Sequence, residues 1–87
     1  MQITVEFFGI PRARAGVAQA TAEGTTLGDV LVNLGKQYPR LADQCIEGEN
    51  LRPGYTANLG GDCFISDPTT RLCEGDTLLL LNLDAGG

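Results

Sequence analysis

The hydrophobic pattern of this chain changes period within its first 40 residues, and that change limits the folds it can form. Near the N-terminus, Ile3, Val5 and Phe7 alternate with polar residues, as in a strand with one buried face. Further on, apolar residues recur at helical spacing: Leu27, Val30, Leu31, Leu34 and Tyr38. A strand and a helix in an 87-residue chain predict an α+β domain.

The helix has clear end signals. Thr26 stands where an N-cap is expected, and Asp29 follows three residues later, the spacing of a capping box. Pro39 ends the helix because a residue before proline is pushed out of the helical region. Gly28 and Gly35 weaken the helix locally. This helix is the most clearly specified element of the sequence.

The remaining segments predict mainly strands and loops. Residues 12–16 read as a loop that joins the first strand to a second one at 17–23. Residues 40–55 are irregular and predict a loop with at most a helical turn. Residues 55–59 and 63–65 form a hairpin around Gly60-Gly61-Asp62, and a last strand covers 77–83. The predicted order is β-β-α-β-β-β.

We therefore expect a mixed sheet of four to five strands with one main helix packed on one face. The last strand is apolar at four consecutive positions, 78–81. If Leu78 and Leu80 face the helix, then Leu79 and Leu81 face outward, and Phe8 joins them because it follows the inward Phe7. Two interpretations stay open: a loop covers these residues, or they form a partner-binding patch.

Length and charge limit the location and partners. The length predicts one domain over residues 1–83, followed by a flexible tail, 84–87. No apolar stretch is long enough to span a membrane, and the N-terminus lacks the features of a secretory signal, so we expect a cytoplasmic protein. A net charge of −5 argues against nucleic acid and anionic membrane as partners and favours a basic protein surface.

The chain offers few groups for catalysis or metal binding. It has no histidine, and the spacing of Cys45, Cys63 and Cys73 matches neither a redox pair nor a zinc site, so three reduced, structural thiols are expected and no metal. Arg12 and Arg14 are read as solvated arginines rather than an anion site. Without a paired acid and base, we expect the protein not to be an enzyme.

The C-terminal residues Gly86 and Gly87 provide the main functional signal. They come shortly after the last predicted strand, and glycine has no Cβ, so such a segment can lie extended in a narrow cleft. Its carboxylate is not screened by a side chain. We therefore expect a terminus suited to chemical activation by a partner.

Several short motifs together resemble the β-grasp sulfur-carrier family. They are Phe7-Phe8-Gly9 with Arg12 and Gly16, Thr26-Leu27 at a helix start, Glu74-Gly75-Asp76 before an apolar strand, and Ala85-Gly86-Gly87. This family includes the molybdopterin synthase small subunit and the thiamine-pathway sulfur carrier, which are relatives of ubiquitin. Members often have proline and valine before the two glycines, whereas this chain has Asn82-Leu83-Asp84-Ala85, a change expected to loosen the tail and to alter partner choice.

The resemblance implies a ubiquitin-like fold and a reaction cycle on Gly87. An E1-like adenylating enzyme would bind the open face and use ATP to form an acyl-adenylate on Gly87, beside Gly86, and a sulfur donor would then displace AMP. The resulting thiocarboxylate would pass its sulfur to a precursor held by a synthase subunit. The implied partner-binding residues are Phe8, Leu79, Leu81, Asp84 and Ala85, and no cofactor is bound by the carrier itself.

Four hypotheses about the function stay open at this point. Molybdopterin synthesis is the first expectation, with this chain as the small non-catalytic subunit of a synthase, and sulfur supply for cysteine, thiamine or a specialised product is the alternative. A ubiquitin-like modifier joined to lysines uses the same activation step. A β-grasp binding module would need no chemistry at its terminus, and an independent enzyme is the remaining alternative.

Overall fold

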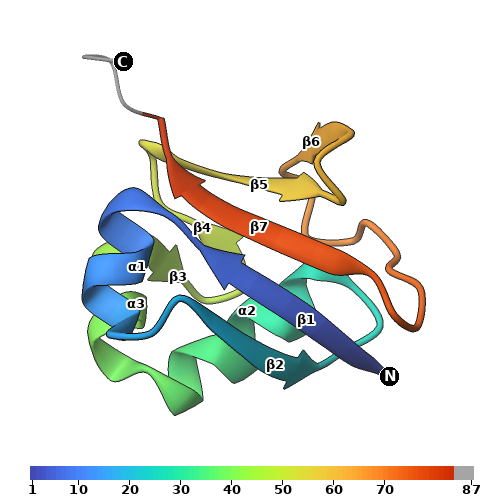
Figure 1. The fold of residues 1–87 in the computed structure, drawn as a ribbon, viewed down its shortest axis with the longest axis horizontal. Helices are drawn as coiled ribbons and strands as arrows, with labels where there is room; N and C mark the ends of the chain where they lie inside the picture. Colours follow the sequence, from blue (N-terminus) through green and yellow to red (C-terminus); the bar gives the residue numbers. More distant parts are fainter. Residues whose placement is uncertain (84–87) are drawn as a thin grey trace.

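The computed structural model of the protein describes residues 1–83, and a five-stranded mixed sheet forms its centre (Figure 1). Its strands are β1 (Gln2–Phe7), β2 (Gln19–Glu23), β5 (Tyr55–Leu59), β6 (Cys63–Ile65) and β7 (Thr77–Asn82). Their order across the sheet is β2-β1-β7-β5-β6. β1 and β7 run parallel, and the other neighbours are antiparallel. The predicted α+β class with a mixed sheet is confirmed.

The helices gather on one side of this sheet (Figure 1). The longest is α2 (Leu27–Gln37), which is accompanied by the shorter α1 (Gly9–Ala15) and α3 (Pro39–Cys45). A separate small hairpin pairs β3 (Ile46–Glu47) with β4 (Asn50–Leu51). The main helix is therefore confirmed at its predicted place, and two further helices join it.

The loop predicted at residues 12–16 is wrong, because these residues belong mostly to α1. Pro11 lies in the first turn, where its missing N–H costs nothing, and two arginines lie in the last turn, where they complement the helix dipole. Gly16 ends the helix in the left-handed conformation and donates its N–H to the Arg12 carbonyl. The helix is only seven residues long and shows no sequence period of its own.

The irregular segment predicted at 40–55 is also more ordered than expected. Pro39 ends α2 as predicted, but it also opens α3, since proline fits the first turn of a helix. Leu41 and Cys45, one turn apart, are the buried residues of α3. The strands β3 and β4 are each only two residues long, too short for an alternating pattern to mark them.

The core lies between the sheet and the helices. From the sheet it contains Ile3, Val5, Phe7, Ala57, Leu78 and Leu80, and from α2 it contains Leu27, Val30, Leu31 and Leu34. The Phe7 ring meets the Tyr38 ring edge to face, with centroids 5.9 Å apart. Burial of one face of β1 and β7 fixes the register of both strands, because a shift by one residue would expose every buried side chain.

The backbone N–H groups at the start of α2 have hydrogen-bond partners. The capping box is present: Asp29 N–H donates to the Thr26 hydroxyl at 3.2 Å, and Thr26 N–H donates to the Asp29 carboxylate at 3.3 Å. The Leu27 and Gly28 N–H groups donate to the Thr70 and Pro68 carbonyls, each at 2.9 Å. A Cβ at Gly28 would approach the Glu49 carboxylate to 2.8 Å and the Pro68 carbonyl to 3.1 Å, so glycine allows this close approach without displacing either neighbour.

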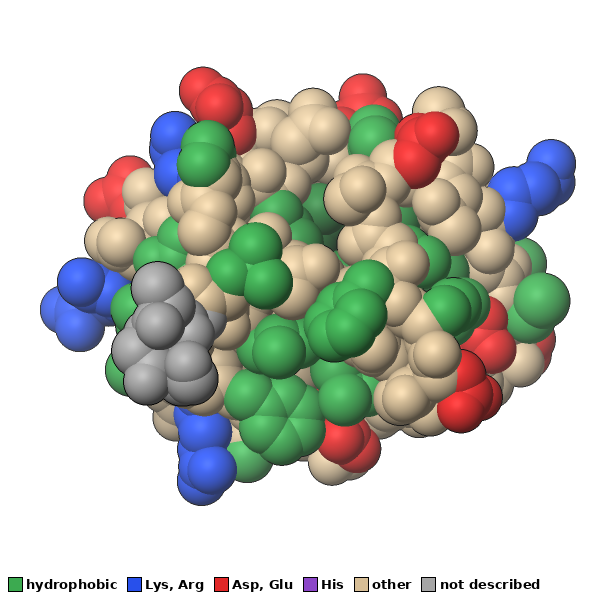
Figure 2. All heavy atoms as spheres, turned by 90° about the horizontal axis from the view of Figure 1, so that it is seen from above, with side chains coloured by type: hydrophobic (Ala, Val, Ile, Leu, Met, Phe, Trp, Pro, Cys, Tyr) green, Lys and Arg blue, Asp and Glu red, His purple; other side chains and the backbone are tan. Residues whose placement is uncertain are grey.

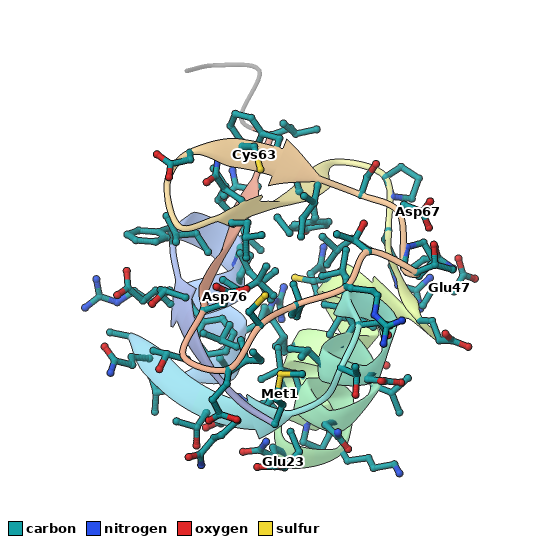
Figure 3. All side chains as sticks on the ribbon, turned by 90° about the vertical axis from the view of Figure 1, so that its right-hand side faces the viewer. Met1, Glu23, Glu47, Cys63, Asp67 and Asp76 are labelled. Carbon is teal, nitrogen blue, oxygen red and sulfur yellow. The ribbon has the colours of Figure 1, made fainter. Side chains whose placement is uncertain are left out.

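All three cysteines are free thiols, but only Cys45 is buried. Burial raises the pKa of Cys45, and a side-chain hydrogen bond with Tyr55 partly opposes that rise. Cys63 and Cys73 are exposed, so the expected structural role fails for those two thiols. Figure 3 shows Cys63 on β6, far from the ion pair between the Met1 amino group and Glu23.

Two further properties hold for residues 1–83. No helix there is long and apolar enough to cross a membrane. Within the same residues, no group of three or more metal-binding side chains comes together. The remaining surface features belong to the sheet and to the end of β7.

Replacement of the N-cap tests the account of α2. Thr26→Ala removes the hydroxyl acceptor and leaves the Asp29 N–H without its partner, so the free energy of unfolding should fall by about 1 kcal/mol. Urea denaturation monitored by circular dichroism measures this change. Thr25→Ala is the matched control, because the Thr25 side chain is exposed and makes no capping bond; an equal loss in both variants would contradict the assignment.

Candidate functional site

The sheet has one face turned away from the helices, and its residues line up across the strands. The register places Gln19, Glu6, Leu79, Asn58 and Phe64 in one row, from β2 to β6. None of these residues belongs to the hydrophobic core or to the apolar side chains packed against it. This outer face is therefore the open face that the sequence predicted.

The outer face is apolar near its middle. Leu79 and Leu81 are partly exposed, while their neighbours Leu78 and Leu80 are buried, which is the alternation expected for β7. Phe8 is 44% exposed, and Phe64 is 66% exposed. Figure 2 shows hydrophobic side chains gathered in the middle of this surface with charged side chains around its rim. We call Phe8, Phe64, Leu79 and Leu81 the apolar patch.

The sequence analysis missed Phe64. Its side chain alternates with that of Ile65, which packs against the core, so Phe64 points to the outer face. The three-residue length of β6 hid this alternation. Phe64 extends the apolar patch across β5 to the edge of the sheet.

A buried amide lies within this row, between Leu79 and Phe64. Asn58 is only 7% exposed, and its Oδ1 is fully covered yet has no hydrogen-bond partner among residues 1–83. Leaving a buried polar atom unpaired costs about 1 to 3 kcal/mol. No sequence pattern indicates this burial, because a polar residue in a strand normally marks an exposed position.

The end of β7 is held from two sides. The Asn82 Oδ1 accepts a hydrogen bond from the Ile10 N–H at 2.9 Å, and the Leu83 N–H donates to the Gly54 carbonyl at 2.7 Å. Leu83 is 61% exposed and lies directly after this anchor. The other predicted site residues, Asp84, Ala85, Gly86 and Gly87, lie outside the described residues.

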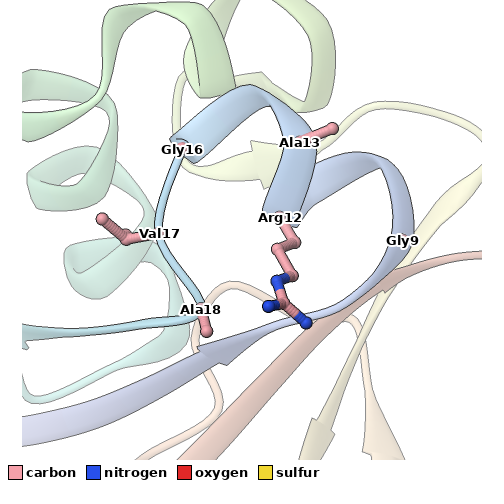
Figure 4. Close-up of a pocket in the computed structure, with 6 residues that line it drawn as sticks. All are labelled: Gly9, Arg12, Ala13, Gly16, Val17 and Ala18. Carbon is pink, nitrogen blue, oxygen red and sulfur yellow. The ribbon is translucent and has the colours of Figure 1, made fainter.

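Positive charge is concentrated on the helices. Arg12 extends from α1 and lines an open pocket of about 410 Å³ beside Gly9 and Gly16 (Figure 4). Arg14 and Arg40 line a second open pocket, of about 340 Å³, with Gln37 and Pro39. Arg12 and Arg14 are both exposed, as expected for solvated arginines, although they lie on a helix and not in a loop.

The described residues offer no catalytic pair. Apart from Cys45, the shifted group is Asp67, whose pKa is lowered by hydrogen bonds from the Thr69 backbone N–H and then from the Thr69 hydroxyl. Asp67 lies in the connection before β7, where these bonds form a tight turn. Among residues 1–83, the outer surface offers an apolar patch and an anchored strand end.

Comparison with solved structures identifies the fold. SAMP1 from Haloferax volcanii, the small archaeal modifier protein 1, has a TM-score of 0.82 at 20% identity, with all of both chains covered. The BexX/CysO complex of Amycolatopsis orientalis has a TM-score of 0.81 at 21% identity, covering 98% of this chain and 99% of the other.

A putative molybdopterin converting factor subunit 1 from Pyrococcus furiosus has a TM-score of 0.76 at 20% identity, covering 94% and 97%. No protein-family model and no curated protein sequence matches. The chain therefore has the ubiquitin-like β-grasp fold that these proteins share.

Asn58 gives a test of the outer face. Asn58→Leu replaces the unpaired amide with an apolar group of similar size beside Leu79 and Phe64, so the free energy of unfolding should rise by about 1 kcal/mol. Chemical denaturation measures it. Thr56→Val, an apolar change on the same face and strand, is the control and should have a smaller effect; a destabilised Asn58→Leu variant would show that the amide is paired after all.

Proposed function

We infer that this protein is a sulfur carrier that is activated at its C-terminal carboxylate by an adenylating enzyme. The observation that carries this proposal is the anchored end of β7 beside the apolar patch, because β7 leads directly to Gly86 and Gly87. Residues 84–87 can span at most about 14 Å. A partner that grips the carboxylate must therefore contact the surface around Leu83 and Phe8.

The proposed chemistry uses the terminal carboxylate as the nucleophile. The Gly87 carboxylate attacks the α-phosphorus of ATP, pyrophosphate leaves, and an acyl-adenylate forms. Hydrosulfide then attacks the acyl carbon and AMP leaves, which produces a thiocarboxylate. Adenylation is needed because a carboxylate has no good leaving group. The carrier supplies no acid or base in this scheme, so the proton transfers belong to the enzyme.

A molybdopterin precursor held by a synthase subunit is the sulfur acceptor that we propose first. The motif resemblance around Phe7, Phe8 and Arg12 supports it, as does the fold shared with the putative molybdopterin converting factor subunit. Sulfur supply for cysteine or another product is the alternative, because the CysO chain has the same fold. The protein acts in the cytoplasm in each case.

Protein modification is the second candidate function. It is favoured by the fold shared with small archaeal modifier protein 1 over the whole chain. The activation step is the same, but the acyl group passes to a lysine amine instead of hydrosulfide. The reaction product therefore distinguishes the two functions: a thiocarboxylate indicates a sulfur carrier, and a conjugate with a lysine amine indicates a modifier.

Intact-mass spectrometry tests the proposal. Before the reaction, the intact mass of the mature protein should equal that of a chain whose last residue is Gly87, because the mechanism acts on the Gly87 carboxylate. After incubation with an E1-like enzyme from the source organism, ATP and sulfide, its mass should rise by the difference between sulfur and oxygen. A variant lacking Gly87 should stay unchanged. Ladders of heavier conjugates would instead favour the modifier, and an unchanged wild-type mass would contradict both.

The apolar patch should carry the contact with the activating enzyme. Leu79→Lys places a charge in the patch, next to Glu6 across the strand pair, and should raise the KM for the carrier at least tenfold, about 1.4 kcal/mol. ATP–pyrophosphate exchange measures this. Thr21→Lys, an exposed position on the same face near the sheet edge, is the control. Equal KM values for both variants would exclude the patch as the docking surface.

A further inference from the structure

The side chain of Asn82 completes a helix that is far from it in sequence. α1 receives no side-chain cap from its own N-cap residue, Phe8. Asn82 lies 72 positions after Ile10, yet its Oδ1 accepts the Ile10 N–H at 2.9 Å. One of the N–H groups that a helix start leaves without a partner is thus satisfied from the end of β7.

Gly9 is the residue that makes room for this contact. Its φ is +59°, a left-handed value that strongly favours glycine. A Cβ at position 9 would collide with the Asn82 Oδ1. The backbone of α1 and the side chain of Asn82 therefore fit each other closely, and both residues are needed for the fit.

The opposite side of the strand end is fixed by the turn before β5. The Leu83 N–H donates to the Gly54 carbonyl at 2.7 Å, and Asn82 pairs with Tyr55 in the sheet. The Phe8 N–H also donates to the Leu80 carbonyl at 2.9 Å, so α1 joins β7 through the main chain as well. The end of β7 is therefore clamped between α1 and the β4–β5 turn.

We propose that Asn82 is a positioning residue, which fixes the point from which residues 84–87 leave the domain. This inference rests on the proposed function. A carboxylate that reaches no more than about 14 Å beyond Leu83 can enter an enzyme only if that starting point is correct. The clamp orders Asn82 and Leu83 before the partner binds, which lowers the conformational entropy lost on binding. Asparagine supplies the acceptor oxygen without adding a charge beside Asp84.

Activation kinetics with an E1-like enzyme from the source organism test this role. Asn82→Ala in the full chain should raise the KM for the carrier about tenfold, since roughly one residue must then be ordered on binding. The kcat should stay unchanged, because no reacting atom is altered. Asn82→Asp keeps an acceptor oxygen at a helix N-terminus and should restore most of the KM. Asn50→Ala, the same change at an exposed strand position, is the control.

Gly9→Ala provides an independent variant. Its Cβ displaces the Asn82 side chain, so the KM for the carrier should rise as in Asn82→Ala. Because both changes remove the same contact, the KM of the double variant should not exceed the higher of the two single-variant KM values. Assays are run at a temperature where circular dichroism shows every variant folded. An unchanged KM for Asn82→Ala would overturn the positioning role.

A second measurement does not depend on activation. The ¹⁵N relaxation of the Leu83 amide should show greater motion in Asn82→Ala than in the wild type, with Asn50→Ala unchanged. Equal order in all three would also overturn the clamp. If the wild type is never adenylated, the proposed function fails, and the relaxation data still decide whether Asn82 orders the strand end.

Discussion

The parallel pairing of β1 with β7 is the constraint on which the rest of this fold depends. Residues near the two ends of the domain, 4–7 and 77–80, lie side by side at the centre of the sheet. The chain between these two strands must therefore leave the β1 side of the pair and return on the β7 side. The helices cover only the face that holds Phe7, Leu78 and Leu80, and the other face stays open. The exposure of the apolar patch follows from this topology.

The elements that could be predicted from the sequence are those whose signals are local. The period of β1, the capping box of α2 and the alternation within β7 all depend on residues close together in the chain. α1 could not be predicted, because it is short and its Ile10 N–H donates a hydrogen bond to the Asn82 Oδ1, which only the folded chain brings near. The β3–β4 hairpin could not be predicted for a similar reason, because its strands are too short to show a hydrophobic period.

The site divides in the same way. Leu79 and Leu81 lie on the outer face as predicted, since alternation alone decides where a strand residue points, and Phe8 is exposed directly after the end of β1. Phe64 and Asn58 complete the row only through the register of three strands. The expectation of a loosened tail concerns residues 84–87, which lie outside the described residues, whereas the anchoring of Asn82 and Leu83 by α1 and by Gly54 has no sequence signal. Side chains that act across the fold leave no local pattern.

The central place of β7 also has a mechanical consequence. β7 is hydrogen-bonded on both sides, to β1 and to β5, and it runs parallel to the strand that begins the chain. Tension between the two ends of the domain would load the β1–β7 ladder along its length, so that its bonds must break together and not one by one. A machine that pulls on the C-terminal end would therefore meet high resistance at once. The two ladders of β7 therefore oppose the transmission of such tension to the core.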